Sequence, residues 1–177
     1  MRSTLRRACL AAIVLLLGAL AIAGCGPGLG GTGTGAAAFD AFGASPAPVC
    51  GGAVAAALSC ASAPAGPPPS GTLPVQFSDA AGQVVLELNG NFARLDDSCL
   101  KLSFSGEFGS TAGGAQGFFG SYQVDSDGHD VLAALSTVPT GGGGALTVEL
   151  QDVAARVVVG PVLLRRTTVP LLAPNPC

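Results

Sequence analysis

The middle of the chain alternates apolar and polar residues with a period of two, which is the spacing of a half-buried β-strand. Between residues 100 and 108, every second residue is apolar or glycine, while lysine, serine and glutamate stand between them. One face of this strand is expected to pack in a core while the other meets water. The inward positions are Leu100, Leu102, Phe104, Gly106 and Phe108.

A β-hairpin is predicted just before this run. Residues 84–88 alternate, Asn89-Gly90 is a pair that tolerates the positive φ of a type I′ turn, and residues 91–95 run back. The run 131–138 is expected to be a strand, although its first residues also suit a short helix. Similar patterns predict further strands at residues 73–77, 118–124, 146–151, 153–159 and 162–169.

Short strands separated by glycine-rich connections predict an all-β domain over residues 72–177. We expect a small antiparallel β-sandwich or barrel of about seven to eight strands. Gly113-Gly114 and the four glycines at 141–144 are typical of its connections. No long amphipathic helices alternate with the strands, which disfavours a Rossmann or other α/β scaffold.

The N-terminus has the layout of a secretory signal. Arg2, Arg6 and Arg7 are followed by residues 8–24, which carry no charge and are rich in leucine, isoleucine and valine. In such signals the basic end stays in the cytoplasm while the apolar stretch enters the translocon. Residues 1–24 are therefore predicted to be a signal peptide.

The signal ends in an aliphatic residue, two small residues and a cysteine: Ile22, Ala23, Gly24 and Cys25. This order resembles the lipobox of bacterial lipoproteins, and the resemblance covers residues 1–25. It implies cleavage before Cys25, a diacylglyceryl group on the Cys25 thiol and an acylated amino end, with palmitate as a typical acyl chain. Two or three acyl chains give stable anchoring where a single chain binds reversibly, so a membrane is an expected partner.

Gly26 follows the cysteine, where an Asp would be similar to the inner-membrane retention signal of Gram-negative lipoproteins. The chain is therefore expected in the cell envelope, at the outer membrane of a cell that has one. Residues 25–71 are rich in glycine, alanine and proline, which predicts a flexible lipidated extension. We expect residues 26–71 to be removable without unfolding the domain at 72–177, except for any disulfide that crosses into it.

Four cysteines remain once Cys9 leaves with the signal and Cys25 is lipidated, and an even number in an exported chain predicts two disulfides. Ten helical steps of ~1.5 Å would separate Cys50 from Cys60 by about 15 Å, beyond the ~7 Å Cα limit for a bridge. A bond between them thus requires a looped segment. We favour Cys50–Cys60 with Cys99–Cys177, and the two crossed pairings remain open.

The composition argues against several functions. After the signal, 11 acidic residues stand against five basic ones, which disfavours nucleic acid as a partner. His129 is the only histidine, so zinc sites with several histidines are excluded. There is no Gly-x-Ser-x-Gly motif, and no lysine follows the glycines at 141–144 as a phosphate-binding loop requires. The chain is not expected to be an enzyme or to hold a cofactor.

Three mid-strand glutamates, Glu87, Glu107 and Glu149, could serve as paired acids of a glycosidase. The chain has one Tyr and no Trp, however, so these carboxylates are expected to be solvated groups on a sheet face. Phe118 and Tyr122, which alternate on one strand face, are expected in the core.

The acidic stretch from Asp125 to Asp130 is the one local cluster that could hold a metal. Its Asp-x-Asp-Gly order resembles the start of a calcium loop, which makes Asp125, Asp127 and Asp130 weak candidates for Ca²⁺ ligands. No carboxylate follows where a bidentate ligand would be needed. Because Asp and Gly favour turns, a plain hairpin loop without metal is the favoured interpretation.

These patterns together predict a non-catalytic, membrane-anchored envelope lipoprotein whose β-domain binds or scaffolds an envelope protein or a ligand. The alternative is a carrier of a small ligand or lipid inside a β-barrel cavity. The two differ in the domain interior, because a carrier needs an apolar cavity on the order of several hundred Å³. A hydrolase is a third and more remote class.

Overall fold

The computed structural model describes residues 36–60, 74–125, 128–169 and 172–177. The predicted signal peptide, the lipobox and Cys25 lie outside the described residues. Within the described ranges, no helix has the length and apolar character needed to cross a membrane.

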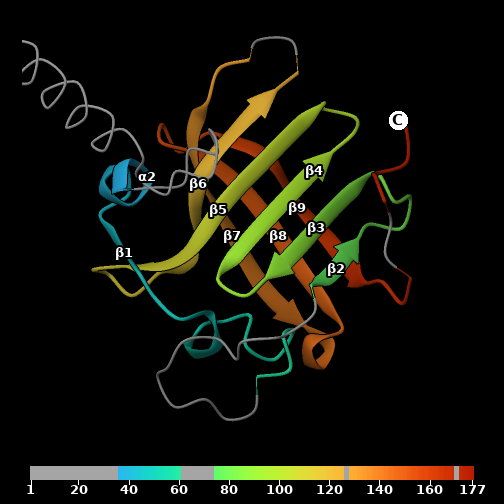
Figure 1. Ribbon diagram of the computed structural model, residues 1–177, viewed down its shortest axis with the longest axis horizontal. Coiled ribbons are helices and arrows are strands. Elements are labelled where there is room, and N and C mark those ends of the chain that lie inside the picture. Colours follow the sequence, from blue (N-terminus) through green and yellow to red (C-terminus); the bar gives the residue numbers. More distant parts are fainter. Residues whose placement is uncertain (1–35, 61–73, 126–127, 170–171) are drawn as a thin grey trace, which may run out of the picture. The chain divides into compact units, whose positions relative to one another are not determined.

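Eight antiparallel strands close into a barrel, which confirms the all-β prediction and decides between barrel and sandwich (Figure 1). Each strand pairs with its neighbours in sequence, and β2 pairs with β9 to close the ring. A short additional strand, β1 (Ala44–Pro46), pairs with the end of β5. The barrel strands are β2 (Val75–Ser78), β3 (Val84–Asn89), β4 (Phe92–Asp97), β5 (Leu102–Thr111), β6 (Gln116–Val124), β7 (Val131–Thr140), β8 (Ala145–Asp152) and β9 (Val157–Arg166).

The predicted hairpin is present as β3 and β4, but its turn lies one residue later than expected. Asn89 pairs with Phe92, so the two turn residues are Gly90 and Asn91. Gly90 has a φ of 57° and Asn91 has no positive φ, a combination typical of a type II′ turn. Asn91 instead uses its Oδ1 to accept the N–H of Val49 at 2.8 Å.

Other strand boundaries also differ. Leu100, predicted on an inward face, lies in the β4–β5 turn and is 46% exposed, because Oδ1 of Asp97 accepts the N–H groups of Cys99 and Leu100 and bends the chain there. The two strands predicted at 153–159 and 162–169 are one strand, β9, after a turn at 153–156. The run 131–138 is the strand β7 and not a helix.

Large apolar side chains fill the barrel interior. Buried positions alternate along β5, as its sequence pattern predicted, and along β8. The largest fully buried side chains in the barrel are Phe77, Phe104, Phe108, Phe118, Leu86, Leu88, Leu95, Leu135, Leu146, Leu150 and Leu164.

One end of the barrel is covered by residues 49–60, which we call the cap. It begins with the 3₁₀ turn η1 (Val49–Gly51) and buries Val49, Val54, Ala57 and Leu58 in the same apolar cluster as the barrel interior. The cap approaches the barrel closely, since a Cβ built on Gly52 would lie 2.1 Å from Cζ of Phe108. At its other side it meets the β7–β8 connection, where η2 (Gly141–Gly143) brings Gly143 against the backbone of Ala56.

The short helix α2 (Ala36–Ala41) lies on the outside of the barrel. Its Phe39, together with Phe42, covers Phe119 on the outer face of β6, at ring centroid distances of 5.8 and 5.4 Å. Residues 36–60 therefore differ from the expected flexible extension, and the folded unit begins before Thr72. Glycine, alanine and proline in this stretch allow close packing on the barrel, which composition alone does not distinguish from a linker.

Candidate functional site

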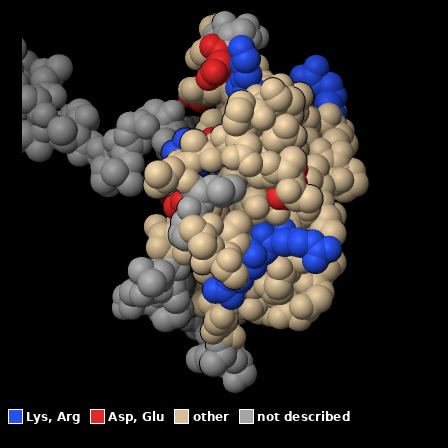
Figure 2. Space-filling view, turned by 90° about the vertical axis from the view of Figure 1, so that its right-hand side faces the viewer, with Lys and Arg blue, Asp and Glu red and all other residues tan. Residues whose placement is uncertain are grey.

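A half-open groove of about 430 Å³ lies on the outer face of strands β2–β5. Residues 172–177, which we call the C-terminal strap, cross this face and form one wall with Leu172, Ala173 and Pro174. Figure 2 views the side on which β2 and the C-terminus lie in Figure 1, and shows a continuous stretch of Lys and Arg residues just below its centre, with acidic residues nearby. The remaining lining residues are Gln76, Val85, Glu87, Arg94, Asp96, Asp97, Ser98, Lys101, Leu102, Ser103 and Asp125.

The groove concentrates charge. Its lining holds four acidic side chains and two basic ones, a formal net charge of −2. Asp96 is held by two neighbours: Nε of Arg94 donates to its Oδ2 at 2.9 Å, and Oγ of Ser103 donates to its Oδ1 at 2.7 Å. Arg94 is 61% exposed, so this ion pair is expected to add little stability and leaves the guanidinium accessible.

Glu87 lies directly across from Arg94 in the β3–β4 register. The Arg94 guanidinium nevertheless turns to Asp96 on its own strand, and the side chain of Glu87 has no hydrogen bond or ion pair within the described part of the chain. The groove thus places the carboxylate of Glu87 beside the Arg94 guanidinium, which is bonded on one side to Asp96. Such an arrangement can bind a polar ligand by charge and hydrogen bonding.

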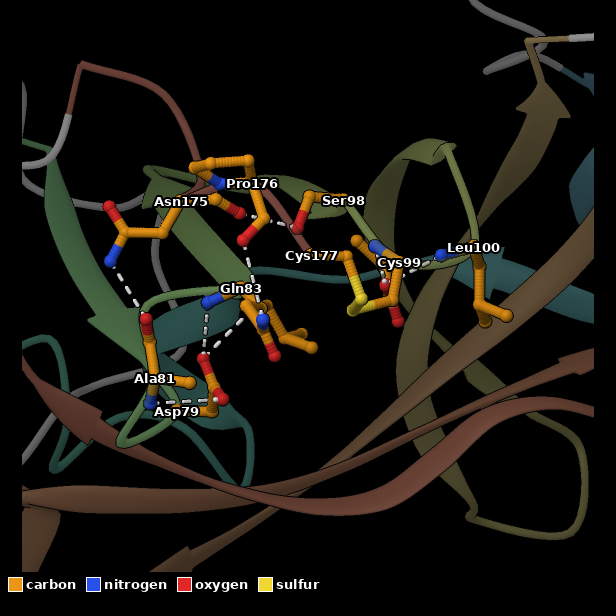
Figure 3. The surroundings of a disulfide bond; sticks show 11 residues. Asp79, Ala81, Gln83, Ser98, Cys99, Leu100, Asn175, Pro176 and Cys177 are labelled. Carbon is orange, nitrogen blue, oxygen red and sulfur yellow. Dashed lines mark hydrogen bonds between the residues drawn. A yellow bond between two sulfur atoms is a disulfide. The ribbon is translucent and has the colours of Figure 1, made fainter.

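A disulfide and a set of hydrogen bonds hold the C-terminal strap in place (Figure 3). Cys177 is bonded to Cys99 in the β4–β5 turn, with a Cα–Cα distance of 4.9 Å. Asn175 donates its backbone N–H to Gly82 O and its side-chain Nδ2 to Ala81 O, both at 2.7 Å. Its own carbonyl accepts from Oγ of Ser98 at 2.6 Å.

The disulfide prediction is confirmed in the favoured pairing, Cys50–Cys60 with Cys99–Cys177. The segment between Cys50 and Cys60 is looped, as that pairing requires, and brings the two Cα atoms to 5.6 Å. The two bonds have different tasks, since the first closes the cap and the second fastens the strap. Both indicate an oxidising compartment such as the periplasm or the extracellular space.

Aspartates shape the turns near the strap. Burial of Asp79 would raise the pKa of its carboxyl, but hydrogen bonds from the backbone N–H groups of Val84, Ala81, Gln83 and Gly82 hold that pKa below its ordinary value. The carboxylate therefore organises the β2–β3 turn, whose carbonyls anchor the strap.

Asp152 has the same function in the β8–β9 turn. The backbone N–H and then the guanidinium of Arg156 lower the pKa of the Asp152 carboxyl, and the N–H of Ala154 adds to this effect. The Asp152 side chain is 1% exposed and bonds Arg156 at 2.6 Å. Through these interactions Asp152 stabilises the β8–β9 turn.

The barrel interior leaves little room for a ligand. Four phenylalanines with at most 1% exposure fill it, and the cap closes one end. An eight-stranded barrel is wide enough either for its own side chains or for one small ligand, and here apolar side chains occupy the interior. Phe118 and Tyr122 point inward as predicted and are part of this packing.

The stretch 125–130 is the loop between β6 and β7, and Ser126 and Asp127 lie outside the described residues. Asp125 is exposed and lines the groove, whereas Asp130 accepts hydrogen bonds from Ser121 at 3.3 Å and Gln123 at 2.8 Å. Among the described residues, no group of three or more His, Cys, Asp or Glu side chains is placed to hold a metal ion. His129 is exposed in the same loop.

The three mid-strand glutamates lie on three different strands, β3, β5 and β8. Glu87 and Glu107 point outward at positions separated along β3 and β5, and Glu149 accepts a hydrogen bond from Gln151 on β8. Of these three, only Glu87 lines the groove. The prediction of side chains on the outer sheet face is therefore confirmed.

Sequence reasoning missed the groove. Its main polar residues, Arg94, Asp96 and Ser103, are the outward positions of the two regions that the period-two pattern described best. The pattern therefore identified the face but not the function, since the strap that walls the groove is distant in sequence, with Cys177 78 residues after Cys99.

No family model matches the chain, and no curated protein or solved structure matches it either.

Proposed function

We propose that this chain is an exported lipoprotein, anchored in the cell envelope through acyl chains on Cys25, and that its β-barrel is a non-catalytic binding module. The basic end, the apolar stretch and the lipobox of residues 1–25 support the anchoring. The two disulfides support a destination outside the cytoplasm. The tether between Cys25 and helix α2 is then ten residues, 26–35, and not the longer extension that composition predicted.

The binding surface in this proposal is the groove beneath the C-terminal strap. The observation that carries it is the packed barrel interior, because a ligand that cannot enter the barrel must bind outside. The groove volume of about 430 Å³ lies within the ordinary range of ligand sites. Its charged lining fits a polar ligand or the polar surface of an envelope protein.

The packed barrel interior also disfavours the carrier alternative. A lipid or apolar ligand needs an apolar cavity, whereas the concave site of this barrel is polar and half-open.

Replacement of Cys25 tests the anchor. A Cys25→Ala protein should keep its signal peptide, fail to incorporate labelled palmitate and run at higher mass, because both processing and acylation require the thiol. Cys9→Ala is the matched control, since Cys9 lies inside the predicted signal and should not affect either step. Equal processing and labelling of the Cys25→Ala and wild-type proteins would exclude lipidation at this residue.

Cross-linking in cells tests the binding surface. A photo-reactive amino acid at position 87, inside the groove, should capture an envelope component that the same group at position 107 does not capture. Both glutamates lie on outward faces of the barrel, so the pair controls for general exposure. Identical products from the two sites would show that the groove is not the binding surface, whatever the result for Cys25.

A further inference from the structure

The two disulfides differ in how far a reductant can reach them. Cys99 and Cys177 are both exposed, whereas Cys50 is 7% exposed and Cys60 is half-buried against the barrel core. A thiolate must contact a sulfur atom to attack a disulfide, so exposure decides which bond exchanges first. Cys99–Cys177 is therefore the accessible bond.

Little besides this bond fastens the strap. Asn175 makes the contacts with Ala81, Gly82 and Ser98, and Gln83 donates weakly to Pro176 O at 3.4 Å. The side-chain bonds lie at exposed positions, where water competes for the same groups. Leu172 is fully exposed, so it contributes no burial that would hold the strap once the disulfide is open.

We propose that Cys99–Cys177 is a redox latch, and that its reduction releases the C-terminal strap and uncovers the groove. The strap walls the groove with Leu172, Ala173 and Pro174, so release converts a half-open groove into an open sheet face. The release itself does not depend on lipid anchoring. Its effect on binding rests on the proposed function of the groove.

The reductant in this proposal is a dithiol, such as the active-site pair of a thiol–disulfide oxidoreductase. One thiolate of the dithiol attacks Sγ of Cys177, the Cys99–Cys177 bond breaks, and Cys99 leaves as a thiolate that takes up a proton. The second thiol of the reductant then attacks the mixed disulfide and releases Cys177 as a thiol. Two electrons and two protons pass to the cysteines, and the reductant becomes a disulfide.

The barrel does not need the latch to keep its local geometry. The β4–β5 turn that carries Cys99 is held by Asp97, whose Oδ1 accepts two backbone N–H groups at 2.9 and 3.0 Å. At the other end, Cys50–Cys60 stays closed within the cap. Reduction should therefore loosen the strap without opening the barrel.

The test is stepwise reduction of the mature protein with dithiothreitol, followed by alkylation and peptide mass mapping. Cys99 and Cys177 should be alkylated at least about tenfold faster than Cys50 and Cys60, because exposure controls the rate. In the selectively reduced protein, hydrogen exchange at the Asn175 amide should rise at least about tenfold. Exchange at Leu95, inside the barrel sheet, should not change.

Two outcomes would overturn the proposal. If Cys50–Cys60 reduces as fast as Cys99–Cys177, exposure does not select the latch. If the Asn175 amide stays protected after selective reduction, the hydrogen bonds alone hold the strap. The Cys99→Ser, Cys177→Ser double variant should reproduce the high Asn175 exchange without reductant, and the wild-type measurement decides the matter if that variant fails to fold.

Discussion

Replacement of Gly52 by alanine should destabilise the barrel, although Gly52 lies far outside the strands in sequence. A Cβ at this position would lie 2.1 Å from Cζ and 2.5 Å from Cε1 of Phe108. The Phe108 ring is 1% exposed and packs edge-on against Phe118 at 5.2 Å, so it cannot move without disturbing the core. The φ of Gly52 is −97°, which alanine adopts freely, so the expected penalty is steric only.

Overpacking of this kind costs about 1–3 kcal/mol in the free energy of unfolding. The neighbouring Gly51 is the matched control, because a Cβ there meets nothing within 4 Å. Gly51→Ala should change the stability by less than about 0.5 kcal/mol, as is usual for exposed positions without special contacts. Urea unfolding followed by circular dichroism gives both values, with a constant denaturant slope as the check that the transition stays two-state.

A second substitution sharpens this test. Phe108→Leu in the Gly52→Ala background should recover part of the loss, so the two changes should be non-additive by at least about 0.5 kcal/mol. If Gly52→Ala costs no more than Gly51→Ala, the cap does not pack on Phe108. The interpretation of residues 49–60 as part of the folded core would then be wrong.

Three further predictions concern the barrel and its turns. Gly120→Ala should cost roughly 3 kcal/mol or more, measured by thermal unfolding, because its Cβ would lie 1.9 Å from the backbone oxygen of Ser105 and only backbone movement can relieve that contact. Phe119→Ala should lower the free energy of unfolding by up to about 3–5 kcal/mol, because it removes a buried ring and leaves a cavity. It should also speed amide exchange in α2, since Phe39 and Phe42 pack on this ring. Asp152 has a lowered pKa, so the stability that its carboxylate contributes is present above pH 3.8 and is lost as pH falls through the lower folded-state pKa. Asp152→Asn should therefore reduce the free energy of unfolding at neutral pH and weaken its fall with pH on the acid side. An unchanged fall on the acid side would exclude this linkage.

The sequence by itself determined the local β-structure. Strict alternation in β5 identifies its inward face, and the alternation around Asn89-Gly90 identifies the β3–β4 hairpin, although its turn lies at Gly90 and Asn91, one residue later than predicted. The alternating pattern gave a wrong prediction where a turn contact determined the backbone path instead. Leu100 continues the pattern in the sequence but follows the Asp97 carboxylate into a turn.

Only the tertiary structure decided barrel closure, the cap and the groove. Closure depends on the pairing of β2 with β9, about 90 residues apart, and a sandwich with the same local strands would satisfy the same alternation. The cap looks like a linker in composition, since small residues pack closely only against a surface that the sequence does not display. The groove likewise forms only when the strap lies beside strands β2–β5, with Cys177 bonded to Cys99 across a separation of 78 residues. Its polar residues become a site only through that distant contact.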